Sequence, residues 1–509
     1  MKEQSERGGK VYLIGAGPGD PGLLTIKAKE ILQACDVVVY DYLANPAFLE
    51  YVGEEAEAIY VGKKSSQHTL SQEEINRLLV DLGKQGKRVA RLKGGDPYIF
   101  GRGGEEAQEL RKNGIPFEVV PGITSAIAAP AYAGIPLSHR DFTSTIGIVT
   151  GHERPDKEKS AIDWEGLARS MGTLVFLMGV KNLKNICSNL IGAGKAPETP
   201  AAMIRWGTTP RQQAVTGTLA TMPEAAEKAG IKPPAILVVG EVVTLRDSLN
   251  WFETRPLFGR RIVVTRARAQ ASDMRRRLEE LGAEVIQFPT IRIQPPASWD
   301  ELDAALDGLA SYDWLIFSSV NGVRFFFERL FQKGKDVRVL GGKLIAAIGP
   351  QTAKELESYG LRADLVPKDY KAEGLLEVFP EGESKKILFP RAKVAREVLP
   401  ESLRKRGHQV DVIPVYETVM EDPDPEVKEA ILSGEVDVIT FTASSTVHNF
   451  VEILGGREAI RALPESIRIA SIGPITSQTL RDYGMPVHVE APVYTIDGLI
   501  RQIVSHLSQ

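Results

Sequence analysis

The residues best suited to hold a small polar ligand form the loop Gly94-Gly95-Asp96-Pro97, which follows a short apolar run ending at Leu92. Glycine lacks a Cβ, so its backbone can adopt positive φ and lie close to a bound molecule. Asp96 adds a negative charge, and Pro97 restricts the exit of the loop. The pattern predicts a ligand loop between a strand and a helix, with a plain strand-to-helix turn as the alternative.

A second loop, Gly15-Ala16-Gly17, also follows a strand, and Asp41 ends the next strand. This arrangement imitates a dinucleotide-binding fingerprint. The third glycine of that fingerprint would fall on Asp20, whose carboxylate would repel a pyrophosphate, and the neighbouring prolines lack N–H donors. We therefore favour a zwitterionic, sulfonium-bearing cofactor, S-adenosylmethionine, over NAD.

Apolar runs of strand length alternate with helical patterns through the first half of the chain, which is typical of a parallel α/β fold. The expected strands are 11–14, 37–40, 58–61, 89–93 and 117–120, with helices at 23–34 and 72–83. Further strands at 146–150, 173–178, 200–204 and 235–240 predict a second lobe. The polar and aromatic segment 245–260 is expected to be a linker.

The second half contains an internal duplication. Residues 312–319 align with 436–443 and residues 345–350 with 469–474 at a shift of 124, and residues 261–267 align with 386–392 at a shift of 125. The repeat predicts two similar parallel-sheet lobes. Strand ends that open into helices present N–H groups that suit anions, although such residues also serve as helix caps. The residues expected to line a cleft are Ser318, Ser319, Asn321, Gly349, Thr352, Thr442, Ser444, Ser445, Gly473 and Thr476.

Composition excludes several classes of protein. The 509 residues predict several domains, and the net charge of -4 lacks the basic excess that nucleic-acid binding usually shows. No apolar run approaches the ~18 residues of a membrane span, and the first ten residues carry no signal-peptide core, so we expect a cytoplasmic protein without a membrane partner. Cys35 and Cys187 are the only cysteines, and we expect two buried apolar side chains with neither a disulfide nor a metal site.

Residues 11 to about 251 resemble the uroporphyrinogen-III C-methyltransferases of the tetrapyrrole methylase superfamily. The resemblance is carried by the motifs 15–21, 40–41, 61–63, 91–104, 121–126, 131–141, 178–179 and 205–208. It implies a cofactor shell of Pro18, Gly94, Gly95, Asp96, Ile99, Thr124, Ser125, Met178 and Gly207. It also implies Asp41 as proton acceptor and Lys63 as proton donor. A structural cap for Asp41 and an anion clamp for Lys63 are the alternatives.

Residues 258–509 resemble uroporphyrinogen-III synthase, a family with two α/β lobes joined by two linker strands. The motifs are 264–266, 317–322, 347–352, 414–418 and 471–474, and the linker strands are expected at 285–293 and 410–418. Arg266 is expected among the substrate-binding residues. Tyr416 is the candidate that assists departure of the substrate hydroxyl, with a structural tyrosine as the alternative.

The resemblances together predict an α/β bifunctional enzyme. The methyltransferase would span residues 10–247, with lobes 10–120 and 121–247, and a linker would span 248–257. The synthase would have one lobe at 258–290 plus 418–509 and another at 291–417. It would close hydroxymethylbilane to uroporphyrinogen III, which the first half would methylate through precorrin-1 to precorrin-2 for sirohaem or cobalamin, releasing S-adenosylhomocysteine. The alternative is that the first half methylates another tetrapyrrole and that the second half is a ligand-binding or sensor module. The resemblance leaves a homodimer through the first half open.

Overall fold

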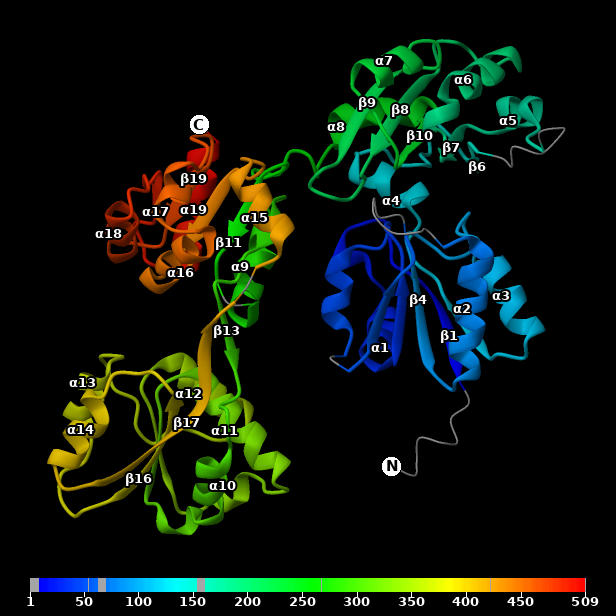
Figure 1. Ribbon diagram of the computed structural model, residues 1–509. Coiled ribbons are helices and arrows are strands. Elements are labelled where there is room, and N and C mark those ends of the chain that lie inside the picture. The colour runs from blue at the N-terminus through cyan, green and yellow to red at the C-terminus, as the bar shows by residue number, and fades with distance from the viewer. Residues whose placement is uncertain are drawn as a thin grey trace. The chain divides into compact units, whose positions relative to one another are not determined.

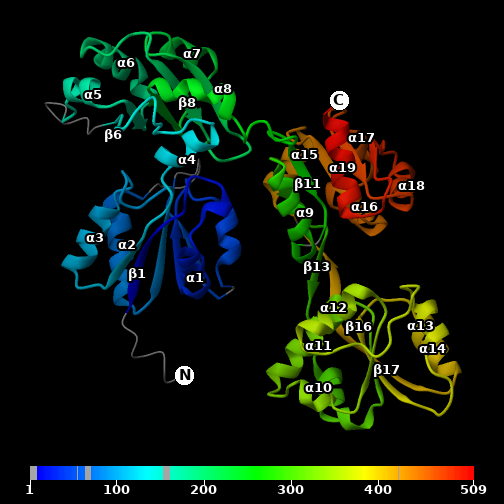
Figure 2. The same cartoon turned by 180° about the vertical axis from the view of Figure 1, so that it is seen from behind.

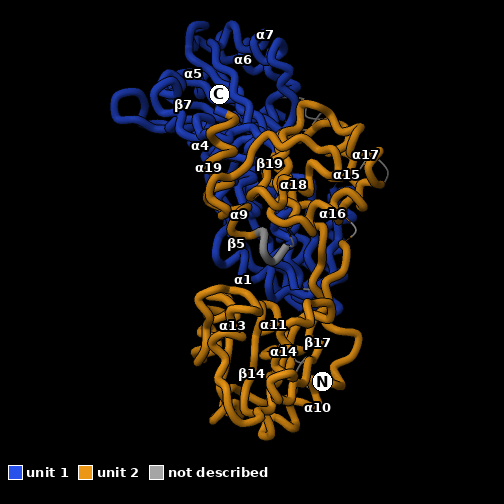
Figure 3. The backbone as a smooth tube through the Cα atoms, turned by 90° about the vertical axis from the view of Figure 1, so that its left-hand side faces the viewer, with its two compact units in different colours: residues 1–261, 277–284, 508 blue, residues 262–276, 285–507, 509 orange. Residues whose placement is uncertain are grey.

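The computed structural model describes residues 9–53, 55–62, 70–152, 161–266, 268–421 and 423–508. The chain divides into two compact units, which Figure 3 colours separately. The first comprises residues 1–261, 277–284 and 508, and the second comprises 262–276, 285–507 and 509. Four five-stranded sheets organise the described residues, and the alternation of strands and helices agrees with the α/β fold that the sequence predicts.

The first sheet is parallel throughout and has the strand order β3-β2-β4-β1-β5. Its strands are β1 (Lys10–Gly15), β2 (Val37–Tyr40), β3 (Glu57–Tyr60), β4 (Arg88–Lys93) and β5 (Phe117–Val120). The helices on this sheet are α1 (Ile26–Ala34), α2 (Gln72–Lys84) and α3 (Gly103–Lys112), and the next helix, α4 (Ser125–Tyr132), packs against the second sheet. The helix expected from residue 23 begins later, because residues 21–23 form a separate 3-10 turn that Asp20 caps.

Both faces of this sheet are covered, and the alternation of side chains along β1 shows how. Val11 and Leu13 pack in one cluster with residues of α2 and α3, whereas Ile14 packs in another with residues of α1. Figure 1 shows α1 on one side of the sheet and α2 and α3 on the other. Because apolar side chains fill both faces, ligands have access only at the strand ends.

The second sheet is mixed rather than parallel, with the order β6-β7-β10-β8-β9. Its strands are β6 (Ile146–Thr150), β7 (Thr173–Leu177), β8 (Pro200–Arg205), β9 (Gln213–Thr218) and β10 (Ala235–Val239). Only β6 and β7 pair in parallel, and the other neighbours are antiparallel. The helices are α5 (Trp164–Ser170), α6 (Leu183–Gly192), α7 (Met222–Lys228) and α8 (Arg246–Leu249). Strand β9 was absent from the sequence prediction because it is a polar edge strand.

The segment expected to be a linker packs on the first unit. The Trp251 indole donates to the Ala131 carbonyl oxygen at 3.0 Å, and the buried Phe252 ring lies 4.8 Å from the Tyr132 ring. Both partners belong to α4. The segment is therefore ordered by contacts with α4, and the domain boundaries given above stay predictions.

The third sheet has the order β12-β11-β18-β19-β20, and the fourth has the order β13-β17-β16-β14-β15. The strands of the third are β11 (Arg261–Val264), β12 (Glu284–Gln287), β18 (Val438–Phe441), β19 (Arg468–Ser471) and β20 (Val489–Glu490). The strands of the fourth are β13 (Ile291–Gln294), β14 (Trp314–Phe317), β15 (Leu344–Ala347), β16 (Lys386–Ala392) and β17 (Gln409–Met420). Each sheet contains parallel pairs, and β13 joins β17 antiparallel.

Helices cover both faces of the fourth sheet: Figure 2 shows α10 and α11 on one side and α13 and α14 on the other. Its helices are α10 (Asp300–Asp307), α11 (Val320–Gln332), α12 (Pro350–Ser358), α13 (Ala372–Val378) and α14 (Val398–Lys405). Those near the third sheet are α9 (Arg268–Glu280), α15 (Pro425–Leu432), α16 (Ser444–Leu454), α17 (Arg457–Arg461), α18 (Pro474–Asp482) and α19 (Ile496–Leu507). The first linker strand, expected as one piece over 285–293, is broken into β12 and β13 around the fully buried Phe288.

Cys35 and Cys187 are buried and form no disulfide, as the sequence predicts. Burial raises the pKa of both thiols to about 11, which keeps them protonated and unreactive. Among the described residues, no helix is long and apolar enough to span a membrane.

The duplication extends to one backbone hydrogen bond, and this generates a prediction about pH. Ile345 N–H donates to the Asp364 carboxylate at 2.7 Å, and Ile469 N–H donates to Nδ1 of His488 at 3.0 Å, 124 residues later. Burial, together with the nearby charge of Arg468, lowers the pKa of His488, because the imidazole must stay neutral to accept this bond.

Acid should therefore destabilise the part of the chain around β19. The unfolded state takes up a proton near pH ~6.5 while the folded state resists it, so the free energy of unfolding falls as the pH drops below that value. His488→Asn keeps an acceptor that does not titrate. Denaturant unfolding at pH ~7.5 and ~5 should show a smaller loss of stability for the variant than for the wild type. An equal loss in both proteins would contradict this role of His488.

Candidate functional site

Three loops cross in close contact at the carboxyl edge of the first sheet. Gly17 and Gly95 exchange backbone hydrogen bonds, with N···O distances of 3.1 and 2.7 Å. A Cβ on Gly122 would lie 2.3 Å from the Gly95 carbonyl oxygen and 2.6 Å from the Gly15 Cα, so only glycine fits. Gly95 itself has φ +69, which other residues adopt only with strain. The loops after β1, β4 and β5 are thus fixed to one another by backbone contact.

Asp96 organises this crossing. One carboxylate oxygen accepts the N–H groups of Tyr98 and Ile99 at 2.8 and 3.2 Å, and the other accepts the Gly122 N–H at 3.0 Å. The sequence predicts Asp96 as a ligand-binding residue, and the structure places it within the loop as an anchor. It shapes the residues around it whether or not it also touches a ligand.

Asp41 lies beside this loop at the end of β2. A Cβ on Gly94 would come within 2.5 Å of the Leu43 Cβ, so the turn after Asp41 and the loop after β4 are in contact. The Asp41 carboxylate is 26% exposed and accepts bonds from the Leu43 N–H at 3.2 Å and from Arg91 at 3.1 Å. Each oxygen of this carboxylate therefore accepts one hydrogen bond from the protein, and the group remains partly open to solvent.

Arg91, which donates to Asp41, also belongs to a buried ionic network. Oε1 of Glu106, a fully buried residue of α3, accepts bonds from Arg91 at 3.3 Å, Lys93 at 2.8 Å and Gln72 at 3.1 Å. Burial, and then repulsion from Arg91, lower the pKa of Lys93. The sequence analysis did not identify this network. Its signal was the pair of charged residues two positions apart in an otherwise apolar strand, which places both side chains on one face of β4.

Loops of the second sheet reach the same region. The Asp20 N–H donates to the Thr208 hydroxyl at 3.2 Å, and the rings of Tyr42 and Trp206 meet edge to face at 5.9 Å. Gly207 lies between Trp206 and Thr208 in the sequence. A Cβ on Gly207 would lie 2.3 Å from the Cβ of Ala129 on α4. The predicted residue Gly207 is thus brought to the loops that carry Pro18 and Asp41.

Backbone strain marks these loops. All described non-glycine residues with positive φ lie in the first unit, and they are Phe100, Arg102, Met178, Trp206 and Thr208. Such conformations cost free energy and gather at functional sites. Arg102 is the N-cap of α3 with φ +60 and forms a two-point ion pair with Glu105 at 2.9 and 2.7 Å.

The remaining predicted residues of this half fall as follows. Ile99 and Met178 are exposed, and Met178 follows β7 with φ +57. Thr124 caps α4, accepting the Ala126 N–H, and Ser125 is the first residue of that helix. Lys63, the predicted proton donor, lies outside the described residues. The structure therefore groups most of the predicted shell at one edge and leaves the proposed roles as predictions.

In the second unit, polar groups gather at the carboxyl edge of the fourth sheet. Ser319 caps α11 by accepting the Gly322 N–H at 3.0 Å, and its hydroxyl oxygen lies 3.0 Å from that of Tyr416 on β17. Ser318 and Asn321 flank this cap, and Gly349 caps α12 after β15. The parallel strands bring these predicted residues to a single edge.

The third sheet repeats the arrangement with fewer bonds from side chains. Thr442 follows β18, Ser444 accepts the Thr479 hydroxyl at 2.8 Å, and Gly473 caps α18. Burial lowers the pKa of Arg266, which follows β11. Thr352 and Thr476 are each 5% exposed and lie in the first turns of α12 and α18, and their contact with a substrate stays a prediction.

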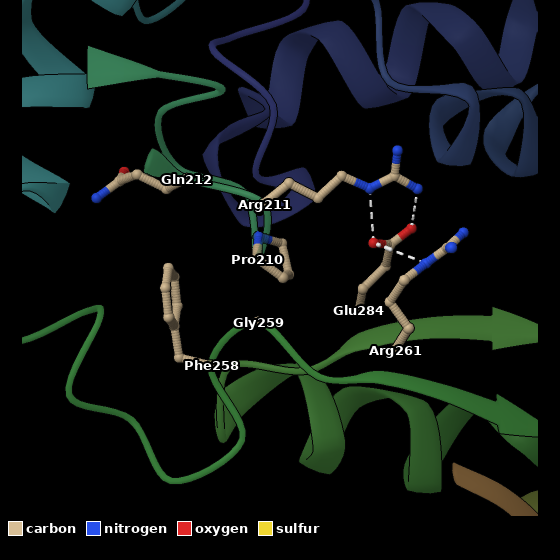
Figure 4. A pocket seen from close by; sticks show the side chains of 7 residues that line it. All are labelled: Pro210, Arg211, Gln212, Phe258, Gly259, Arg261 and Glu284. Carbon is tan, nitrogen blue, oxygen red and sulfur yellow. Dashed lines mark hydrogen bonds and ion pairs between the residues drawn. The ribbon is translucent and has the colours of Figure 1, made fainter. Parts of the chain in front are cut away.

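Figure 4 shows an open pocket of the first unit, lined by Pro210, Arg211, Gln212, Phe258, Gly259, Arg261 and Glu284. Arg211 and Arg261 both pair with Glu284. None of the residues that line this pocket is among the predicted site residues. Within the described residues, no group of three or more His, Cys, Asp or Glu side chains could hold a metal ion.

Comparison with known proteins gives two family matches. Residues 10–223 match the model described as Tetrapyrrole (Corrin/Porphyrin) Methylases, and residues 272–501 match Uroporphyrinogen-III synthase HemD. The chain is 40% identical over 500 residues to the porphyrin biosynthesis protein HemD of Ruminiclostridium josui, covering 97% of this chain and 98% of that protein.

Two further relatives match the first half. The chain is 56% identical to an S-adenosyl-L-methionine-dependent uroporphyrinogen III methyltransferase of Methanosarcina barkeri, covering 48% of this chain and 95% of that protein. The crystal structure of a Thermus thermophilus uroporphyrin-III C-methyl transferase complexed with S-adenyl homocysteine is 41% identical, with coverages of 47% and 100% and a TM-score of 0.40.

The loop crossing generates a prediction about stability. Gly122→Ala would force its methyl group against the Gly95 carbonyl, and such overpacking typically costs about 1–3 kcal/mol of unfolding free energy. Gly104→Ala is the matched control, since a Cβ there meets nothing within 4 Å. We expect denaturant unfolding to show a loss for the first variant only. Equal stability of the two variants would contradict the close crossing.

Proposed function

We propose a two-step function for this chain, which belongs to the tetrapyrrole methylases through its first half and to the uroporphyrinogen-III synthases through its second. The second half would close hydroxymethylbilane to uroporphyrinogen III with inversion of the last pyrrole. The first half would then transfer two methyl groups from S-adenosylmethionine to that ring, giving precorrin-2 by way of precorrin-1. The observation that carries the proposal is the identity with one relative over nearly the whole length of both chains.

The loops of the first unit fit S-adenosylmethionine. Residues 94–99 and 121–125 carry no lysine or arginine, and their only charge is Asp96, so nothing in them repels a sulfonium cation. Tyr98, Ile99 and Phe100 are exposed side chains that follow this glycine loop, and Met178 is exposed after β7; we propose that they contact the adenine ring. When bound, S-adenosylmethionine supplies an electrophilic methyl group. Gly94, Gly95, Thr124, Ser125, Pro18 and Gly207 would hold it.

Asp41 would accept the proton that the methylated pyrrole must lose. The pyrrole carbons of a porphyrinogen are electron-rich, so methyl transfer needs mainly alignment, and the proton leaves afterwards. A carboxylate held by Arg91 and by the Leu43 N–H, yet partly exposed, is placed to take that proton. Lys63 would return a proton or clamp a substrate carboxylate.

The second half would act mainly by folding its substrate. The linear tetrapyrrole carries eight carboxylates, which suit the helix N-termini at the carboxyl edges of the third and fourth sheets. Tyr416, on the strand β17 that pairs with both β13 and β16, would assist departure of the terminal hydroxyl. The product of this half would be the substrate of the other, which gives the fusion a chemical purpose. We place the end product on the sirohaem or cobalamin route and propose a homodimer through the first half.

The direct test is a coupled assay with the full-length protein, hydroxymethylbilane and methyl-labelled S-adenosylmethionine, read by mass spectrometry. We expect the type III ring to appear and then to gain two labelled methyl groups. Release of only the spontaneously formed type I ring would contradict the synthase function and favour a ligand-binding or sensor role for the second half. Absence of label from added uroporphyrinogen III would contradict the methyltransferase function.

A substitution tests the role of Asp41. Asp41→Asn keeps an acceptor for the Leu43 N–H and removes the base, so methylation should fall by roughly 10²–10⁴-fold. Binding of S-adenosylhomocysteine, measured by calorimetry, should stay close to that of the wild type. Asp81→Asn, on the exposed side of α2, is the control and should retain activity. Full methylation by Asp41→Asn would exclude Asp41 as the base.

A further inference from the structure

Tyr416 is held in place from two sides. It is buried, its ring stacks on that of Phe325 with centroids 5.8 Å apart and planes at 16°, and its hydroxyl oxygen lies 3.0 Å from the Ser319 Oγ. Ser319 is the N-cap of α11 and Phe325 lies in its second turn, so the first two turns of one helix contact the phenol. The sequence analysis assigned Ser319 to the substrate cleft without connecting it to Tyr416.

The hydrogen-bond capacity of Ser319 determines what it can do for the phenol. A serine hydroxyl has one proton to donate and two lone pairs. One lone pair accepts the Gly322 N–H at 3.0 Å, which fixes the oxygen at the helix terminus. The Ser319 proton and the second lone pair remain, so either hydroxyl can donate across the 3.0 Å contact with Tyr416. If Ser319 donates, the phenol proton remains available to another group.

We propose that Ser319 is a positioning residue for Tyr416: its hydroxyl donates to the phenol oxygen, so that the phenol proton faces the departing hydroxyl of the substrate. The inference rests on the proposed synthase function and deepens it. As the C–O bond of the substrate breaks, its electron pair leaves with the oxygen, which takes the Tyr416 proton and departs as water. The pyrrole nitrogen supplies electrons to the carbon left behind. The phenolate oxygen keeps the hydrogen bond from Ser319 until the closed ring returns a proton.

The internal duplication supports this assignment independently. The shift of 124 places Ala443 at the position equivalent to Ser319. Ala443 caps α16 without a side-chain hydrogen bond. The helix that follows β18 of the third sheet therefore lacks the hydroxyl that Ser319 supplies after β14 of the fourth sheet.

The test is a double-mutant cycle in the full-length protein with Ser319→Ala, Tyr416→Phe and the double variant. We measure kcat and KM for conversion of hydroxymethylbilane, together with the ratio of type III to type I ring. Ser319→Ala should lower kcat by roughly 10-fold with little change in KM, the effect expected for one lost hydrogen bond. In the Tyr416→Phe background the same substitution should have almost no further effect on kcat.

A second pair of variants separates this role from helix capping. Ser319→Gly also removes the hydroxyl, but glycine is a far better helix cap than alanine, so both variants should lose kcat equally while only Ser319→Ala loses stability. Ser319→Thr restores the hydroxyl and should recover much of kcat. These two variants keep the test available if Ser319→Ala does not fold.

Three outcomes would overturn the proposal. An equal loss from Ser319→Ala with and without the Tyr416 hydroxyl would show that Ser319 acts independently. A raised KM with unchanged kcat would make it a substrate-binding residue. Retention of full kcat by Ser319→Gly would reduce it to a cap. The wild type is assayed first, and formation of the type III ring establishes the proposed synthase function. The three outcomes above then concern Ser319 alone. A wild type that yields only the type I ring would overturn both the synthase function and the role of Ser319.

Discussion

The close contact of three backbone segments at Gly15, Gly95 and Gly122 is the constraint on which the first unit depends. No side chain larger than hydrogen fits between these loops, so their positions follow from one another. The Asp96 carboxylate then fixes the exit of the middle loop by accepting three N–H groups. The turn that carries Asp41 rests against the same loop. A crossing of backbone therefore sets the distance between the expected donor loop and the expected base.

The buried charges next to Asp41 compensate one another. Arg91 and Lys93 project from one face of β4 into the interior, where Glu106 compensates both. Burying a lone cation would be prohibitive, but a paired group can be held in a fixed place. Arg91 also reaches Asp41, so the carboxylate at the edge is connected to a buried carboxylate through a single guanidinium. In the second unit, the hydrogen bond between Ser319 and Tyr416 likewise holds a candidate catalytic side chain in a fixed place.

Much of the fold could be predicted from the sequence, and the failures have physical reasons. Alternating apolar runs gave the first sheet and the repeat gave the third and fourth, because buried parallel strands are nearly continuous in hydrophobicity. Apolar runs do not show whether neighbouring strands are parallel or antiparallel. The sequence therefore predicted four strands of the second sheet but not their mixed pairing. Strand β9 was not predicted because it is polar and lies at the edge of its sheet. The first linker strand is interrupted at Phe288, whose side chain is fully buried. At the sites, glycine spacing indicated the loops. The Arg91 and Glu106 network was not predicted: the two charges in β4 indicated a shared face, but the bonds join residues 13 to 50 positions apart.

The most direct measurement of the central claim is a crystal structure of the protein with bound S-adenosylhomocysteine. We expect the ligand to lie against the backbone of residues 94–96, with its sulfur turned toward the side on which the Asp41 turn meets that loop. A ligand bound elsewhere in the chain, with residues 94–96 untouched, would contradict the proposed assignment of donor, base and loop.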